Sequence, residues 1–173
     1  MEHMWSPWRS RHMTHSTTAE SVAGDDSGSP DESVFSRIAR RDNDEADYVL
    51  WRGTHAYVLL NLYPYNNGHL LVVPYRQKST WLGLSDEERS EMTDLVTRCM
   101  AWLTEALHPD GYNVGVNVGQ AAGAGIPNHI HMHVVPRWAA DTNFMPTTAN
   151  TRVLPESLAQ TWSKLRRVVE STR

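Results

Sequence analysis

The sequence has a single cysteine in 173 residues, and it has neither a long apolar run nor a block of basic residues. One cysteine excludes an intrachain disulfide and argues against a thiolate-based metal site. The N-terminus lacks the basic start and apolar run of a signal peptide, and no segment is apolar over the length of a membrane-spanning helix. These absences predict a cytoplasmic protein in a reducing compartment.

The charge balance argues against two classes of partner. The chain carries 16 Lys and Arg against 20 Asp and Glu, which gives a formal net charge of -4. Surfaces that bind duplex nucleic acid or anionic membranes normally carry a basic patch. We therefore expect neither nucleic acid nor a membrane as a partner. The length and a hydrophobic fraction of 40% predict one domain with a substantial core.

Composition divides the chain into three parts. Residues 1–13 form a short arm whose Trp5 and Trp8 are expected to dock on the domain or on a partner subunit, with a frayed terminus as the alternative. Residues 14–32 are rich in Ser, Thr and Gly and contain five acids but no Lys or Arg, which predicts a flexible linker. Residues 33–173 form the predicted domain.

Hydrophobic periodicity within this domain alternates between strands and helices. Strands are expected at residues 48–53, 55–64, 69–75, 111–119 and 129–138. Helices are expected at 33–42, at 85–109 and from Pro155 to about Val169. Ser85 and Glu88 form a capping box, and Asn67-Gly68 is a strong turn signal. The pattern predicts an α+β domain, an antiparallel-leaning sheet with helices packed on it.

Three of the nine histidines, His129, His131 and His133, fall within five residues of the segment "NHIHMHVVPRW". Side chains alternate between the two faces of a strand, so these rings share one face while Ile130 and Met132 point into the core. Rings on one face are spaced roughly 6 to 7 Å apart along a strand. At that spacing they can meet at one ligand.

Three interpretations of this segment compete. The first is an exposed polar face, which a single histidine would suggest but three in alternation make a minority option. The second is a metal site, which needs acids to hold the imidazoles; the nearest one downstream is Asp141, and the preceding loop has none. The third is nucleophilic catalysis, in which a neutral imidazole attacks phosphorus.

The loop before the histidines favours the third interpretation. It reads "GVNVGQAAGAGIPN" and places four glycines at residues 115, 119, 123 and 125. Glycine lets a backbone turn so that consecutive N–H groups point at an anion, although hairpins also use glycine. A phosphate cradle beside a nucleophilic imidazole indicates nucleotidyl transfer, and a metal site gains nothing from such a loop.

The run from His129 to Val135 resembles the signature of the histidine-triad, or HIT, superfamily. "NLYPYNNGHLLVVPYR" resembles the strand-turn-strand with which that family binds the nucleoside. "GAGIPNHIHMHVVPRW" followed by "DTNFMP" is similar to the branch that contains diadenosine tetraphosphate phosphorylases and dinucleoside polyphosphate hydrolases. The resemblance covers about Tyr48 to Asn150, and the "MWSPWRSRHM" arm resembles the start of bacterial members. It implies a HIT-like fold and a homodimer with a sheet continuous across both subunits.

The resemblance also implies a role for each matching residue. His131 would be the nucleophile, His133 would contact the phosphate or bridging oxygen, His129 would hold the cluster, and His69 would complete it from the neighbouring strand. Trp138 would stack near the nucleotide, with plain packing as the alternative. The other expected substrate-binding residues are Asn61 at the ribose and, around the phosphates, Asn117, Gln120 and the backbone of Ala124 and Gly125.

The implied reaction is cleavage of a dinucleoside polyphosphate through a nucleotidyl-histidine, with phosphate or water as the acceptor. A phosphoramidase-type hydrolase and a weakly catalytic nucleotide-binding module that acts through partners are the alternatives. Magnesium is expected only as a companion of the substrate, because the sequence shows no acidic metal cluster. Many bacterial relatives bind a structural zinc through a Cys-x-x-Cys pair, a downstream His and the first histidine of the triad. Ser33, Ser36 and Gln77 stand at the first three positions here, so we predict no structural zinc.

Overall fold

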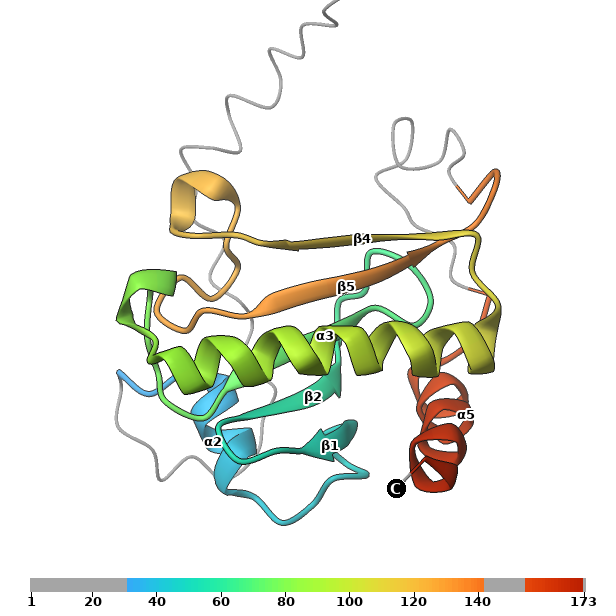
Figure 1. The fold of residues 1–173 in the computed structure, drawn as a ribbon, viewed down its shortest axis with the longest axis horizontal. Coiled ribbons are helices and arrows are strands. Elements are labelled where there is room, and N and C mark those ends of the chain that lie inside the picture. The colour runs from blue at the N-terminus through green and yellow to red at the C-terminus, as the bar shows by residue number, and fades with distance from the viewer. Residues whose placement is uncertain (1–30, 142–154, 173) are drawn as a thin grey trace, which may run out of the picture.

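The computed structural model describes residues 31–141 and 155–172. The predicted arm, the linker up to residue 30 and most of "DTNFMP" lie outside these residues. The described part contains a five-stranded sheet in the order β1-β2-β3-β5-β4, and each neighbouring pair is antiparallel, as Figure 1 shows. The strands are β1 (Val49–Arg52), β2 (Ala56–Leu60), β3 (Leu70–Pro74), β4 (Gly111–Val116) and β5 (Met132–Arg137). The predicted α+β class is confirmed.

Three α-helices and two short 3-10 turns accompany the sheet in the described residues. The helices are α2 (Val34–Arg40), α3 (Asp86–Leu107) and α5 (Leu158–Ser171), and the turns are η1 (Trp81–Gly83) and η2 (Gln120–Ala122). Helix α3 runs across one face of the sheet beside α5, whereas α2 lies near the ends of β1 and β2 (Figure 1). The described part includes no helix that is both long and apolar enough to cross a membrane.

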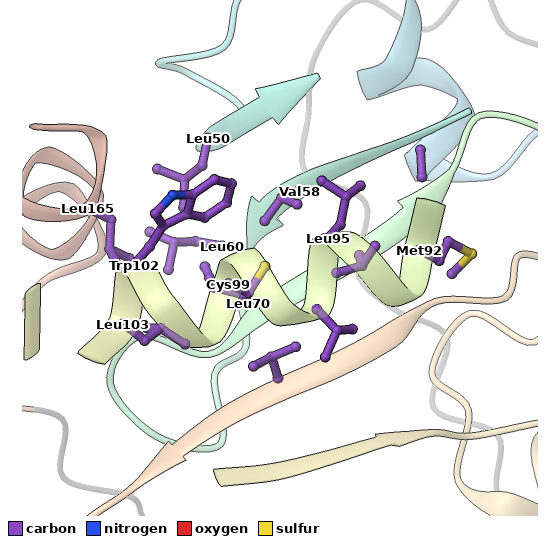
Figure 2. Close-up of a cluster of buried hydrophobic side chains, with 14 of the residues drawn as sticks. Leu50, Val58, Leu60, Leu70, Met92, Leu95, Cys99, Trp102, Leu103 and Leu165 are labelled. Carbon is purple, nitrogen blue, oxygen red and sulfur yellow. The ribbon is translucent and has the colours of Figure 1, made fainter. Parts of the chain in front are cut away.

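Helix α3 begins as its sequence predicts. The Ser85 side chain accepts the Glu88 N–H, and the Glu88 carboxylate accepts the Ser85 N–H, so the capping box is confirmed. The helix ends at His108, which takes the left-handed conformation with φ of 50° that glycine more often supplies. Figure 2 shows its apolar side chains, among them Leu95 and Leu103, interdigitating with residues of the sheet.

The two faces of the sheet bury different hydrophobic clusters because strand residues alternate between them. The larger cluster joins the sheet to α3 and α5. The smaller one joins Phe35 and Ile38 of α2 to strand residues that include Tyr57 and Leu71. Leu71 pairs with His133 across β3 and β5, so the histidine side of the sheet is the α2 side.

Helix α2 is held at its C-terminal end by one guanidinium. Arg52 of β1 donates to the carbonyls of Ile38, Ala39 and Arg41 and forms an ion pair with Asp44 at 2.8 Å. A cation beside the last carbonyls of a helix satisfies acceptors that have no partner within the helix. This contact fixes α2 against the sheet.

Several predicted boundaries were wrong. Strand β2 ends at Leu60 rather than at residue 64, and β4 ends at Val116 rather than at residue 119. Strand β5 begins at Met132 rather than at residue 129, because the preceding residues approach the sheet as a loop tied by the Ile130 N–H to the Lys78 carbonyl. Helix α5 begins at Leu158 rather than at Pro155. Ser157 is its N-cap and forms a capping box with Gln160, and such a reciprocal cap decides a helix start more strongly than a first-turn proline.

Candidate active site

The first histidine of the cluster is fully buried and uses both ring nitrogens inside the protein. His129 Nε2 lies 2.8 Å from the Pro74 carbonyl oxygen, so this nitrogen carries the proton and donates. Nδ1 is therefore an acceptor, and it receives the Ser33 hydroxyl at 2.5 Å. Both nitrogens are occupied, so the ring has no nitrogen left for a ligand.

The second histidine presents a free lone pair. His131 Nδ1 lies 2.9 Å from the His129 carbonyl oxygen, to which it must donate, so Nε2 is unprotonated in the neutral ring. Phe35 packs against this ring with centroids 5.0 Å apart. The side chain is only 5% exposed, so packing and one hydrogen bond fix the direction of its Nε2 lone pair.

The third histidine, His133, is protonated on Nε2, and a chain of hydrogen bonds from Tyr65 through His69 explains why. His69 Nδ1 accepts the Tyr65 backbone N–H at 3.0 Å, so the His69 proton sits on Nε2. That nitrogen lies 2.9 Å from His133 Nδ1 and donates to it. His133 therefore carries its own proton on Nε2, a buried atom with no hydrogen-bond partner in the described structure.

The unpartnered His133 N–H points to a ligand. Leaving a buried donor without a partner costs about 1–3 kcal/mol, so native proteins rarely do it without a reason. The His131 and His133 rings lie 4.9 Å apart between centroids. The pair therefore offers one lone pair and one N–H side by side, which suits attack on phosphorus together with a hydrogen bond to a phosphate or leaving oxygen.

Burial keeps all three triad rings neutral. Burial lowers the pKa of His129 and of His131. In each ring a hydrogen bond to a backbone carbonyl raises the pKa but does not outweigh the effect of burial. Burial lowers the pKa of His133 to about 4, and the nearby charge of a protonated His131 lowers it further. A nucleophilic imidazole must be unprotonated, so the site is competent at neutral pH.

Strand β4 leaves open space beside the histidines. Gly115 pairs with His133, and a Cβ built at Gly115 would meet no atom within 4 Å. Gly119 and Gly123 follow in the loop with φ of 80° and 85°, which only glycine adopts without strain. The loop is joined to the cluster by the His129 N–H, which donates to the Ile126 carbonyl. The strand and loop thus leave open space beside His133.

The structure brings some of the predicted substrate-binding residues near the cluster. Asn61 Nδ2 lies 3.3 Å from His69 Nδ1, so its amide already supports that ring; its ribose contact stays a prediction. Asn117 and Gln120 lie in the loop after β4, where Asn117 Nδ2 reaches the Gly123 carbonyl at 3.5 Å and Gln120 is exposed. These positions are compatible with phosphate contacts, which also stay predictions.

Two further expectations stay predictions. The Ala124 amide, expected to hold a phosphate, donates to the Gly119 carbonyl at 3.3 Å, and Gly125 is exposed. Trp138, expected to stack near the nucleotide, packs at the end of α3. Its indole N–H donates to the His108 carbonyl at the end of α3, and it lines a hollow with Leu107 and other residues. That is the packing alternative, favoured here because the helix end offers an acceptor for the indole.

Two aromatic residues of the site were missed at the level of sequence. Phe35 of α2 contacts the His129 and His131 rings, with centroids 5.6 and 5.0 Å apart. Tyr65 stacks on His133 with centroids 5.7 Å and planes 20° apart, and is 47% exposed. The position of Tyr65 four residues before His69 was a usable signal, whereas no local pattern places Phe35 beside residues so distant in the sequence.

The positions that correspond to the zinc ligands of relatives do come together around His129. Ser33 Oγ and Ser36 Oγ lie 2.5 and 3.4 Å from His129 Nδ1, and Gln77 Oε1 lies 3.1 Å from Ser36 Oγ. Neutral hydroxyl and amide groups do not fit zinc, which is bound by thiolate, imidazole and carboxylate. Across residues 31–141 and 155–172, no group of three or more His, Cys, Asp and Glu side chains is arranged to hold a metal.

Comparison with known proteins agrees with this geometry. Residues 43–140 match the family described as "HIT domain". This match covers more than half of the 173 residues. The chain belongs to the HIT domain family.

Two individual proteins and one solved structure are similar to this chain. The chain is 36% identical over 161 residues to a Mycobacterium tuberculosis protein named AP-4-A phosphorylase, covering 93% of this chain and 80% of that protein. It is 36% identical over 98 residues to a Saccharomyces cerevisiae bis(5'-adenosyl)-triphosphatase, covering 53% of this chain and 45% of the yeast protein. The solved structure of a zinc-bound histidine triad family protein from Mycobacterium smegmatis superposes with a TM-score of 0.65 at 26% identity, covering 80% of this chain and 94% of that one.

Proposed function

We propose that this protein cleaves dinucleoside polyphosphates of the diadenosine tetraphosphate type through a nucleotidyl intermediate on His131. The observation that carries the proposal is the pairing of the His131 Nε2 lone pair with the unpartnered N–H of His133. The named activities of the mycobacterial and yeast relatives support the substrate class.

The reaction has two displacements at one phosphorus. His131 Nε2 attacks, a phosphorus–nitrogen bond forms, and the bond to the bridging oxygen breaks. The His133 N–H donates to the oxygen that leaves or to the phosphoryl group, where charge develops. Phosphate or water then attacks the same phosphorus, the phosphorus–nitrogen bond breaks, and His131 returns to its neutral state.

Phosphate is the acceptor we favour. The relative named AP-4-A phosphorylase aligns with 93% of this chain, whereas the yeast triphosphatase aligns with 53%. Phosphorolysis of diadenosine tetraphosphate yields ADP and ATP. Hydrolysis yields AMP and ATP, or two ADP, so the products separate the two reactions.

The test incubates the full chain with diadenosine tetraphosphate, with and without inorganic phosphate, and separates the nucleotides by chromatography. ADP and ATP that form only with phosphate support phosphorolysis, and products without phosphate assign water as the acceptor. His131→Ala should abolish turnover and leave the thermal unfolding of the protein near that of the parent. Full activity in that variant contradicts the mechanism. Nucleotide binding without products supports the binding-module alternative, and turnover only of adenosine phosphoramidates supports the phosphoramidase alternative.

We further propose a homodimer formed through β4. This strand lies at one end of the sheet order, and Val114 and Val118 are 45% and 44% exposed. Pairing β4 with its copy would cover such side chains and extend the sheet. Light scattering during gel filtration tests this, and a monomeric mass contradicts it. Magnesium remains proposed only as a companion of the substrate, and the cytoplasm as the location.

A further inference from the structure

We propose that Ser33 is a positioning residue of the active site: its hydroxyl fixes the His129 ring and thereby the carbonyl group that orients His131. The inference rests on the proposed function only in taking His131 as the nucleophile. It assigns to Ser33 a task that the sequence does not show, because 96 positions separate Ser33 from His129.

Ser33 performs two tasks with one oxygen. Its Oγ accepts the Ser36 N–H at 3.1 Å, which caps the start of α2. The same oxygen lies 2.5 Å from His129 Nδ1, to which its proton must go because the Pro74 carbonyl already holds the proton on His129 Nε2. Ser33 is 4% exposed, so water does not compete readily for this bond.

Neighbouring groups hold Ser33 in this orientation. The Ser33 N–H donates to Gln77 Oε1 at 2.9 Å, and the Ser36 hydroxyl donates to the same oxygen at 3.1 Å. Gln77 Nε2 in turn donates to the Asp31 carbonyl at 2.9 Å. The Ser36 proton goes to Gln77, and the Ser36 N–H goes to Ser33 Oγ. The Ser33 proton then has two acceptors, Ser36 Oγ at 3.1 Å and His129 Nδ1 at 2.5 Å, and the shorter contact assigns it to His129.

Ser33 acts on the nucleophile His131 through the backbone carbonyl of His129. The carbonyl of His129 accepts the His131 Nδ1–H at 2.9 Å, and this bond leaves the lone pair on His131 Nε2. His129 is held on one side by Pro74 and on the other by Ser33, so losing Ser33 frees one side of the ring. Small displacements of a reacting group cost about 10²-fold in rate when they reach about 1 Å.

The experiment separates this role from helix capping. Ser33→Gly removes the hydroxyl from His129 but keeps a residue that caps almost as well, since glycine at an N-cap costs only a few tenths of a kcal/mol relative to serine. Ser33→Thr keeps the hydroxyl. Ser157→Gly makes the same N-cap replacement in α5, which takes no part in the histidine cluster, and is the matched control.

The first readout is nitrogen NMR of the imidazole rings in the free protein, which needs no substrate. In the parent and in Ser33→Thr, His129 should be protonated on Nε2 with a hydrogen-bonded Nδ1, and His131 protonated on Nδ1. In Ser33→Gly, the Nδ1 signal of His129 should move toward that of a nitrogen without a donor, and the His131 ring should lose its single tautomer. Unchanged signals from both rings in Ser33→Gly would overturn the proposal.

The second readout is turnover of diadenosine tetraphosphate. Ser33→Gly should lower kcat about tenfold or more with KM within about twofold, because orientation of the nucleophile is lost and binding is not. Ser33→Thr should recover most of the rate, and Ser157→Gly should keep it. An unchanged kcat in Ser33→Gly with normal parent activity overturns the proposal. If the parent shows no turnover, the proposed function fails, and the NMR comparison alone decides the role of Ser33.

Discussion

Replacing His133 with asparagine should make the stability of the protein less sensitive to acid. In the folded parent, burial lowers the pKa of His133 to about 4 from the ordinary 6.5. Between these two values the unfolded chain binds a proton that the folded protein does not bind. The substitution His133→Asn removes this titration, because the amide that replaces the imidazole can still accept the proton of His69 Nε2 but does not itself titrate.

The direction and the magnitude of the change in stability with pH follow from this difference in proton binding between the folded and unfolded states. The free energy of unfolding falls as pH drops below about 6.5, continues to fall until about pH 4, and receives no further loss from this group below that. Each unit of pKa corresponds to about 1.4 kcal/mol, so the shift contributes at most about 3.5 kcal/mol over the window, and screening by solvent around this partly exposed ring reduces that contribution. The pKa values of His129 and His131 are also lowered, so both add to the loss in the parent and persist in the variant.

The assay is urea unfolding followed by tryptophan fluorescence at several pH values between about 7.5 and 4.5, which cover most of the window of this titration. The slope of stability against pH is compared rather than absolute stability, because His133→Asn also changes the contact with His69. Leu82→Asn, at a side chain that is 92% exposed and does not titrate, is the control and should keep the parent slope. The reasoning is refuted if His133→Asn and the parent lose stability equally across this window.

Three further predictions concern other parts of the site. Gly115→Val should fold normally and lose at least about tenfold in activity, because a Cβ at this position meets no atom within 4 Å and the larger side chain fills the space beside His133. Gly111→Val, at the far end of β4, should keep activity in the same assay. Arg52→Met should lower the free energy of unfolding by about 2 kcal/mol in urea titrations, since it removes charge-assisted bonds to the carbonyls at the end of α2. Elemental analysis should find much less than one zinc per chain, because the groups around His129 are neutral oxygens, and one equivalent would contradict this.

Local signals predicted most of the fold. Helix α3 carries its start signal within four residues, at Ser85 and Glu88, and β3 is a continuous apolar run that is buried along its whole length. The start of α5 was misplaced because Pro155 and Ser157 are both plausible first-turn signals, and only the reciprocal bond with Gln160 decides between them.

The grouping of the histidines was predictable from the sequence, but their hydrogen bonds were not. Alternation placed His131 and His133 on one side, and the family signature added His69. The tautomer of each ring depends on groups far apart in sequence, such as the Pro74 carbonyl and the Ser33 hydroxyl, which no local pattern relates. Trp138 shows the same limit, since its acceptor is a carbonyl at the end of a helix 30 positions earlier.

The division of the apolar residues between the two faces of the sheet has a consequence for motion. The cluster under α3 and α5 is large, whereas the cluster under α2 is small and α2 has only seven residues. Segments with little buried apolar contact open at lower free energy than the rest of a domain. The amide hydrogens of α2 should therefore exchange with solvent before those of α3, and each such opening would admit water to the histidines while the remainder of the protein stays folded.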